Sequence, residues 1–182
     1  MTFPPAEQVP PTRWARTVDG ACIAYQDFGE GPSTLVYVQG WISHIEVAWE
    51  WPSYARKLRR LAKNMRVLHF DKRGVGMSDR LSGAPSLDVQ MDDIRAVMDA
   101  AGVERAALFT TGWVSPAMAA FFAATHPDRT EALWLDGPVH YAQDEDYPWG
   151  ESEAEWDEFV STFCPTWGTD KNIQFVKAGL PE

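Results

Sequence analysis

The chain has 182 residues, which suits one domain with a sizeable core, and its 45% apolar and 23% charged residues are typical of a globular protein. Its net charge of -10 disfavours nucleic acids and anionic membrane surfaces, so we expect neither as a partner. Nine tryptophans are an unusual number, and we expect most of them in the core or in the wall of a pocket.

The N-terminus and the cysteines indicate a cytoplasmic protein. Residues 1–11 are rich in proline and lack the apolar segment of a signal peptide, and no apolar run reaches the length of a membrane span. Cys22 and Cys164 fit neither a metal-binding pattern nor a Cys-x-x-Cys pattern. We therefore expect a reduced, cytoplasmic chain that carries no metal and no cofactor.

Strands and helices alternate along the chain after an initial hairpin. Two strands, 14–17 and 22–28, flank an Asp-Gly turn and predict this hairpin. Further strands are predicted at 35–38, 66–70, 106–109 and 132–135, and helices at 52–63, 87–101, 116–125 and 151–163. This alternation predicts an α/β fold in which a mostly parallel sheet is flanked by helices. The strands that end at Val38, Phe70 and Phe109 should then finish at one edge of the sheet.

Three of the predicted helices carry a recognisable start signal. Pro52 suits the first position of its helix, and Ser86 suits the N-cap of the helix that Gly102 follows. The pair Ser115 and Pro116 fits the same pattern, as N-cap and first helical residue.

Two loops that follow predicted strands have distinctive sequences. Gly40 lets the backbone turn and present N–H groups as half of an oxyanion hole, although a plain strand-to-loop turn is the simpler interpretation. The block 71–80 is not a P-loop, because the Gly-x-x-x-x-Gly-Lys order is absent. Rather than bind an anion, this block should be held together by hydrogen bonds and ion pairs of its polar residues, Asp71, Arg73, Ser78 and Asp79.

Taken in order, these segments resemble a known family. They resemble the α/β-hydrolase domains at the N-terminus of certain actinobacterial, especially mycobacterial, adenylate cyclases and their stand-alone relatives, through the loop at Gly40 and residues 71–80, 91–99 and 123–129. Residues 146–150, Trp156 and Trp167-Gly168 are similar to the start of that family's cap region. The resemblance covers Arg13 to Gly168 and implies an incomplete α/β-hydrolase fold. This fold would comprise a flexible N-terminus at 1–12, the N-terminal half of the hydrolase core at 13–140, and the start of a cap or lid with a tail at 141–182.

The resemblance places a nucleophile in a Gly-x-Ser-x-Gly turn between a strand and a helix, where this chain reads Thr-Thr-Gly-Trp-Val-Ser-Pro. Counting from the strand puts Gly112 at the nucleophile position, and counting back from the end of the helix puts Trp113 there. Neither side chain can attack a carbonyl. Ser115 is a weak candidate, because the following Pro116 has no N–H to donate to an oxyanion.

The other two members of a catalytic triad are equally weak in the sequence. Asp136 follows the last predicted strand, and its simpler role is to cap the turn with Gly137. His140 comes only four residues later, whereas the family carries its acid and its base on separate loops. The remaining histidines precede the turn, lie within a strand or follow a helix: His44, His69 and His126.

Three interpretations of function remain open. In the first, the chain is a degenerate or truncated homologue without hydrolytic activity that serves as a binding or regulatory scaffold. Its pocket for a small apolar or ester-like ligand would be lined by Gly40, Trp41, Trp113 and Val114. The alternative is a serine-type carboxylic-ester or lipid hydrolase with a remodelled site, and the third interpretation is a remnant of a longer coding sequence. An exposed strand at 132–135 would also predict a homodimer, or a partner chain that covers this sheet edge.

Overall fold

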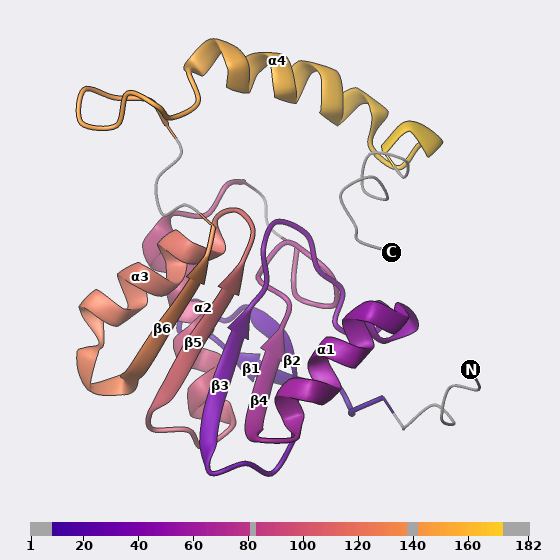
Figure 1. The fold of residues 1–182 in the computed structure, drawn as a ribbon, viewed down its shortest axis with the longest axis vertical. Helices are drawn as coiled ribbons and strands as arrows, with labels where there is room; N and C mark the ends of the chain where they lie inside the picture. The colour runs from indigo at the N-terminus through magenta and orange to yellow at the C-terminus, as the bar shows by residue number, and fades with distance from the viewer. Residues whose placement is uncertain (1–8, 81–82, 138–141, 173–182) are drawn as a thin grey trace. The chain divides into compact units, whose positions relative to one another are not determined.

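The computed structural model describes residues 9–80, 83–137 and 142–172 (Figure 1). Contacts between Cα atoms divide the chain into two units, 1–139 and 140–182. Over the described ranges, no helix is both long enough and apolar enough to cross a membrane.

The first unit is built on a six-stranded sheet with the order β1-β2-β4-β3-β5-β6. The pairs β1–β2 and β2–β4 are antiparallel, and the remaining pairs are parallel, which confirms the predicted α/β fold with an antiparallel start. Val38 lies opposite both Phe70 and Thr110, so β3, β4 and β5 finish at one edge of the sheet, as predicted. The strands are β1 Arg13–Arg16, β2 Cys22–Phe28, β3 Ser33–Val38, β4 Met65–Phe70, β5 Ala106–Thr111 and β6 Thr130–Asp136.

The helices begin close to their predicted start signals. Pro52 opens α1, and the Ser86 side chain caps α2 by accepting a hydrogen bond from the backbone N–H of Val89 at 3.5 Å. Gly102 follows α2 with a φ of 65°, a conformation that favours glycine. The helical segments are η1 Val47–Glu50, α1 Pro52–Ala62, α2 Leu87–Ala100, α3 Ser115–Thr125, η2 Pro127–Arg129, α4 Glu153–Phe163 and η3 Cys164–Thr166.

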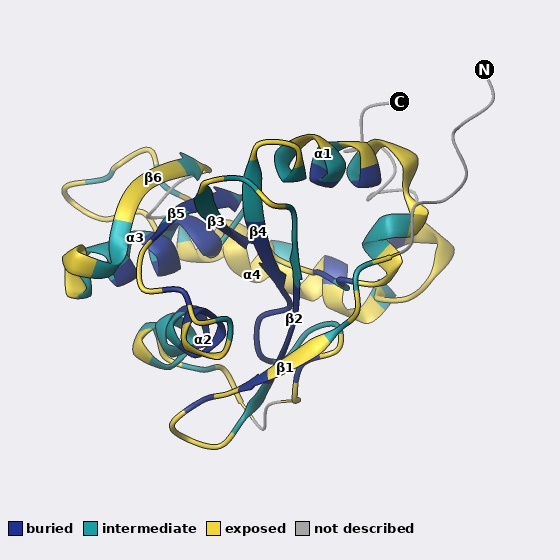
Figure 2. Ribbon diagram, turned by 90° about the horizontal axis from the view of Figure 1, so that it is seen from below, coloured by how far each residue is buried: buried dark blue, intermediate teal, exposed yellow. Residues whose placement is uncertain are grey.

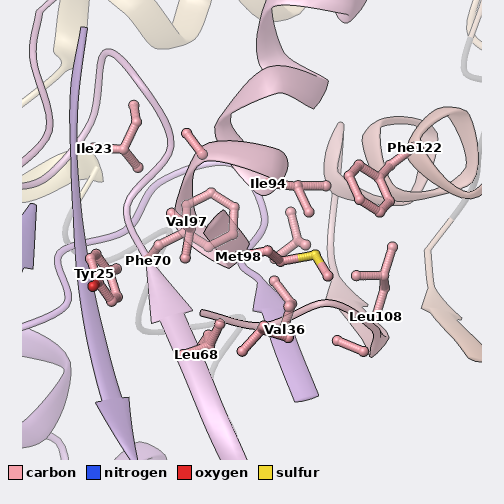
Figure 3. Close-up of a cluster of buried hydrophobic side chains, with 14 of the residues drawn as sticks. Ile23, Tyr25, Val36, Leu68, Phe70, Ile94, Val97, Met98, Leu108 and Phe122 are labelled. Carbon is pink, nitrogen blue, oxygen red and sulfur yellow. The ribbon is translucent and has the colours of Figure 1, made fainter. Parts of the chain in front are cut away.

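Alternate residues of the central strands pack against helices on opposite faces of the sheet. The larger core cluster joins one face to α2 and α3, and Figure 3 shows Ile94 and Met98 of α2 among the side chains of Val36, Leu68 and Leu108. The smaller cluster lies under α1 on the other face and contains Leu35, Tyr37, Leu58, Val67 and Phe109. Burying each of these aliphatic or aromatic side chains contributes about 1.5–3 kcal/mol.

The block 71–80 is a structural loop, as predicted. The Asp71 carboxylate accepts hydrogen bonds from the backbone N–H groups of Ile45 at 3.1 Å and Met77 at 2.9 Å. The Arg73 guanidinium donates to the buried Asp93 carboxylate at 2.8 Å. A Cβ added to Gly76 would lie 2.0 Å from a carboxylate oxygen of Asp71, so only glycine fits there. The other predicted members take part as well, Ser78 through the Asp71 carbonyl at 2.6 Å and Asp79 through the Cys22 N–H at 2.8 Å.

The tryptophans do not fill the core, so that part of the expectation drawn from their number is wrong. All nine lie in the described ranges and none is buried. Trp134 on β6 is 67% exposed, and Figure 2 shows that most of β6 is exposed as well. Many of the indoles therefore face solvent at least in part.

The second unit is organised around α4. Its N-cap is Ser152, which forms a reciprocal capping box with Glu155. Trp156, Phe159 and Phe163 stack along one side of the helix, with ring centroids 5.5 and 5.1 Å apart. The helix predicted at 151–163 is therefore present, and it carries an aromatic face.

Candidate functional site

The connection between β5 and α3 is a sharp turn with a strained residue. Val114 adopts a φ of 69° and a ψ of -44°, and the Ser115 N–H donates to the Trp113 carbonyl at 2.8 Å. These are the features of a three-residue γ-turn with positive φ, a rare conformation. Because valine is β-branched, holding it there costs about 1–3 kcal/mol. Gly112, at a φ of 73°, allows the chain to leave the strand just before this turn.

Three glycine turns crowd together at the carboxyl edge of the sheet. A Cβ added to Gly40 would lie 2.3 Å from the Thr111 carbonyl oxygen, and one added to Gly137 would lie 2.3 Å from the Gly112 carbonyl oxygen. The loops after β3, β5 and β6 therefore approach one another backbone against backbone. At Gly40 this close approach requires glycine, a reason that the sequence alone does not reveal.

Ser115 is not the N-cap of its helix, contrary to the prediction. Val114 is the N-cap, Ser115 is the first helical residue and Pro116 is the second, because the γ-turn carries the change of backbone direction at Val114. The Ser115 side chain is fully buried, and its hydroxyl donates to the Gln39 carbonyl at 2.8 Å. This hydroxyl therefore ties the turn to the loop that contains Gly40.

The predicted pocket residues come together around this turn. The rings of Trp41 and Trp113 stack with centroids 6.0 Å apart and an interplanar angle of 25°. Trp41 is 39% exposed and Val114 is 37% exposed, so both can contact a ligand. Asp136 ends β6, and its backbone N–H donates to the Thr110 hydroxyl at 3.2 Å. His140 lies outside the described residues.

A polar chain that sequence reasoning missed runs from α1 to the turn. The Lys57 ammonium donates to the Tyr37 hydroxyl at 2.6 Å, and the Tyr37 hydroxyl lies 3.0 Å from the Thr111 hydroxyl. Since an ammonium can only donate, Tyr37 accepts from Lys57, and its hydroxyl shares a second hydrogen bond with Thr111 in which either oxygen can be the donor. The last residue of β5 is thus held by a side chain from β3.

A second polar contact positions Gln39 beside the same turn. His69 is fully buried, and its Nε2 lies 2.8 Å from the Gln39 side-chain oxygen. An amide oxygen only accepts, so Nε2 carries the proton. Burial, with a smaller contribution from the nearby Lys57 charge, lowers the pKa of His69 to about 3. His69 is therefore neutral near pH 7 and serves to orient Gln39.

Nothing in the described part of the chain gathers three or more His, Cys, Asp or Glu side chains that could hold a metal ion. What the described groups offer is an exposed aromatic and aliphatic surface beside tightly packed backbone turns. Their hydroxyls and imidazole are engaged in holding those turns together.

Comparisons with known proteins establish the fold. No family model matches the sequence. A hydrolase from Pseudomonas aeruginosa PA01 superposes with a TM-score of 0.63 at 24% identity, over 83% of this chain and 52% of that one. An esterase from Exiguobacterium antarcticum superposes with a TM-score of 0.69 at 22% identity, over 82% of this chain and 54% of that one.

A third similar structure belongs to a protein described as a member of the alpha/beta hydrolases superfamily. It is one of the epoxide hydrolases of the alpha/beta hydrolases superfamily from metagenomes of hot environments, with a TM-score of 0.60 at 19% identity, over 72% of this chain and 43% of that one. The chain therefore has an α/β-hydrolase fold and spans about half the length of the solved structures that it matches. At these identities the likeness establishes the fold and carries no activity over to this chain.

Proposed function

We propose that this chain is a non-hydrolytic protein of the α/β-hydrolase fold that binds a small apolar or ester-like ligand beside Trp41, Trp113 and Val114. The observation that carries this proposal is the Ser115 hydroxyl, which is buried and donates to the Gln39 carbonyl at 2.8 Å. Acyl transfer requires a hydroxyl or thiol that is free to reach a carbonyl.

The other hydroxyls of the turn support the same conclusion. The Thr110 hydroxyl accepts from the Asp136 N–H, and the Thr111 hydroxyl is paired with Tyr37. An oxyanion in this fold also needs the N–H of the residue after the nucleophile, and Pro116 has none to offer behind Ser115. A hydrolase would therefore have to rebuild this turn before it could react.

The surface beside the turn supports ligand binding without chemistry. Two stacked indoles and the Val114 side chain offer an apolar wall. A scaffold of this kind suits a regulatory role. The proposal includes a relation to the hydrolase-like domains of actinobacterial adenylate cyclases, which the sequences of residues 71–80 and 123–129 support.

Calorimetric titration of the purified chain with ethyl hexanoate tests the proposal. We expect binding that weakens at least about tenfold in Trp113→Ala, because losing a contact of ~1.4 kcal/mol changes the dissociation constant by that factor. Trp14→Ala is the matched control, since Trp14 lies on β1 and is 56% exposed.

Two outcomes would contradict the proposal. One is equal affinity in Trp113→Ala and Trp14→Ala, which would place the ligand elsewhere. The other is the appearance of free hexanoate above a heat-denatured control, which would instead support the ester-hydrolase alternative.

A further inference from the structure

A pocket of about 670 Å³ lies between residues 9–12 and residues 44–50. This volume is within the range of pockets that bind small molecules. The apolar residues that line it are Val9, Pro10, Pro11, Val47 and Trp49. Among the described residues that line it, none belongs to the surface formed by Trp41, Trp113 and Val114, so this pocket is a separate candidate site.

Hydrogen bonds at two places hold the walls of this pocket together. The fully buried Gln26 of β2 donates its side-chain N–H to the Pro10 carbonyl at 3.0 Å and accepts from the Trp49 indole N–H at 2.8 Å. The Thr12 hydroxyl donates to the Glu46 carboxylate at 2.6 Å. Because proline fixes the backbone φ, a wall of two adjacent prolines has little freedom left to lose when a ligand binds. The pocket is therefore preformed.

The polar side chains of the pocket make it acidic. Glu46 and Glu50 bring two carboxylates, and the described residues that line the pocket include neither lysine nor arginine. The His44 Nδ1 accepts a hydrogen bond from the Val47 N–H at 3.3 Å, so this nitrogen carries no proton and the imidazole adds no positive charge. Apolar walls and two carboxylates together favour a ligand that is apolar over most of its surface and positively charged at one end.

We propose that this pocket binds a small organic cation, an ammonium group on an apolar body. The body packs against the prolines, Val47 and Trp49, and the ammonium donates charge-assisted hydrogen bonds to Glu46 and Glu50. Since the Arg59 guanidinium already lies over the Trp49 ring, 5.6 Å from its centroid, the carboxylates rather than this ring select the charge of the ligand. The net charge of -10 on the chain further favours a cation over an anion.

Heteronuclear NMR titration with phenethylammonium tests the pocket and its preference for a cation. The indole N–H signal of Trp49, assigned by its loss in Trp49→Phe, reports on the pocket wall because this N–H donates to Gln26. We expect this signal to shift saturably below ~5 mM ligand, while the indole signals of Trp41 and Trp113 stay in place. Phenethyl alcohol has nearly the same shape without the charge and should bind at least about tenfold more weakly, and hydrocinnamate, an anion, should not bind.

Two double variants provide the second readout. Glu46→Gln with Glu50→Gln removes both carboxylates of the pocket and should weaken the binding of phenethylammonium at least about tenfold. Glu30→Gln with Glu104→Gln is the matched control, because it removes two exposed carboxylates outside the pocket and should leave the affinity unchanged.

Three outcomes would overturn the proposal. The absence of a Trp49 shift, with or without shifts at Trp41 and Trp113, would show that the cation does not enter this pocket. Equal affinity for phenethylammonium and phenethyl alcohol would show that the pocket does not select a charge. Equal weakening in the two double variants would show that Glu46 and Glu50 act only through the overall charge of the chain.

Discussion

Replacing Ser115 by alanine separates a structural hydroxyl from a latent nucleophile. In the wild type this buried hydroxyl donates to the Gln39 carbonyl at 2.8 Å, and its other carbonyl neighbours, Thr111 and Trp113, lie at 3.3 and 3.4 Å. Alanine would leave the Gln39 carbonyl without this donor. The expected loss in the free energy of unfolding is therefore about 1–3 kcal/mol, the cost of an unsatisfied buried acceptor.

Urea denaturation followed by circular dichroism measures this loss, and the chain supplies a matched control. Ser43 is also buried, at 6% exposure, but its hydroxyl has no hydrogen-bond partner. Ser43→Ala should therefore leave the free energy of unfolding unchanged or raise it slightly. If Ser115→Ala proves no more destabilising than Ser43→Ala, the hydroxyl is not held as described and the argument against Ser115 as a nucleophile loses its basis.

Three further predictions concern two buried titratable groups and one glycine turn. The pKa of His69 is about 3 in the folded chain against 6.5 ordinarily, so between these pH values the unfolded chain binds a proton that the folded chain does not. The free energy of unfolding should therefore fall as the pH drops below 6.5, by up to about 1.4 kcal/mol per pH unit. In urea denaturation at a series of pH values, His69→Gln should lack this contribution, and an identical slope would refute the prediction. Burial lowers the pKa of Lys72 to about 8 from 10.5, so stability should rise between these pH values, and Lys72→Met should be the more stable protein at pH 7 but lose that advantage above pH 10.5. Gly76→Ala places a Cβ 2.0 Å from the Asp71 carboxylate at a φ of 53° and should cost more than about 1 kcal/mol in thermal or urea unfolding, whereas Gly83→Ala, with open space around it, should cost nothing comparable.

The predictions that succeeded rest on local signals. The Asp-Gly turn of the first hairpin, Pro52 at the start of α1 and Ser86 at the cap of α2 act within a few residues, so the chain itself displays them. The parallel sheet follows from the alternation of strands and helices. The position of β4 between β2 and β3 is a property of the whole sheet, and no local signal records it.

The turn after β5 shows how a local signal can mislead. A serine followed by proline fits an N-cap and a first helical residue, but the chain enters the helix one residue earlier, through Val114 at a positive φ. Valine is among the residues least suited to that conformation, so propensity argues against the observed turn. Packing of Gly40 against the Thr111 carbonyl and the buried Ser115 hydrogen bond accompany this strain.

The polar contacts behind the turn depend on register between strands that are distant in sequence. Tyr37 lies opposite His69 on one neighbouring strand and opposite Phe109 on the other. The sequence offered one signal for these contacts: Tyr37 and His69 are polar aromatic residues inside two strands otherwise rich in apolar residues. Their partners Lys57 and Gln39 come from a helix and a loop, and only the folded sheet brings them together.

The central claim, that the turn carries no reactive nucleophile, is tested most directly by a fluorophosphonate probe read out by intact-protein and peptide mass spectrometry. The hydroxyls of Thr110, Thr111 and Ser115 are all hydrogen-bonded, and Thr110 and Ser115 are also buried, so we expect no adduct beyond that of the heat-denatured chain. A stoichiometric adduct on native protein that maps to Ser115 and disappears in Ser115→Ala would contradict the account and identify the chain as a serine hydrolase.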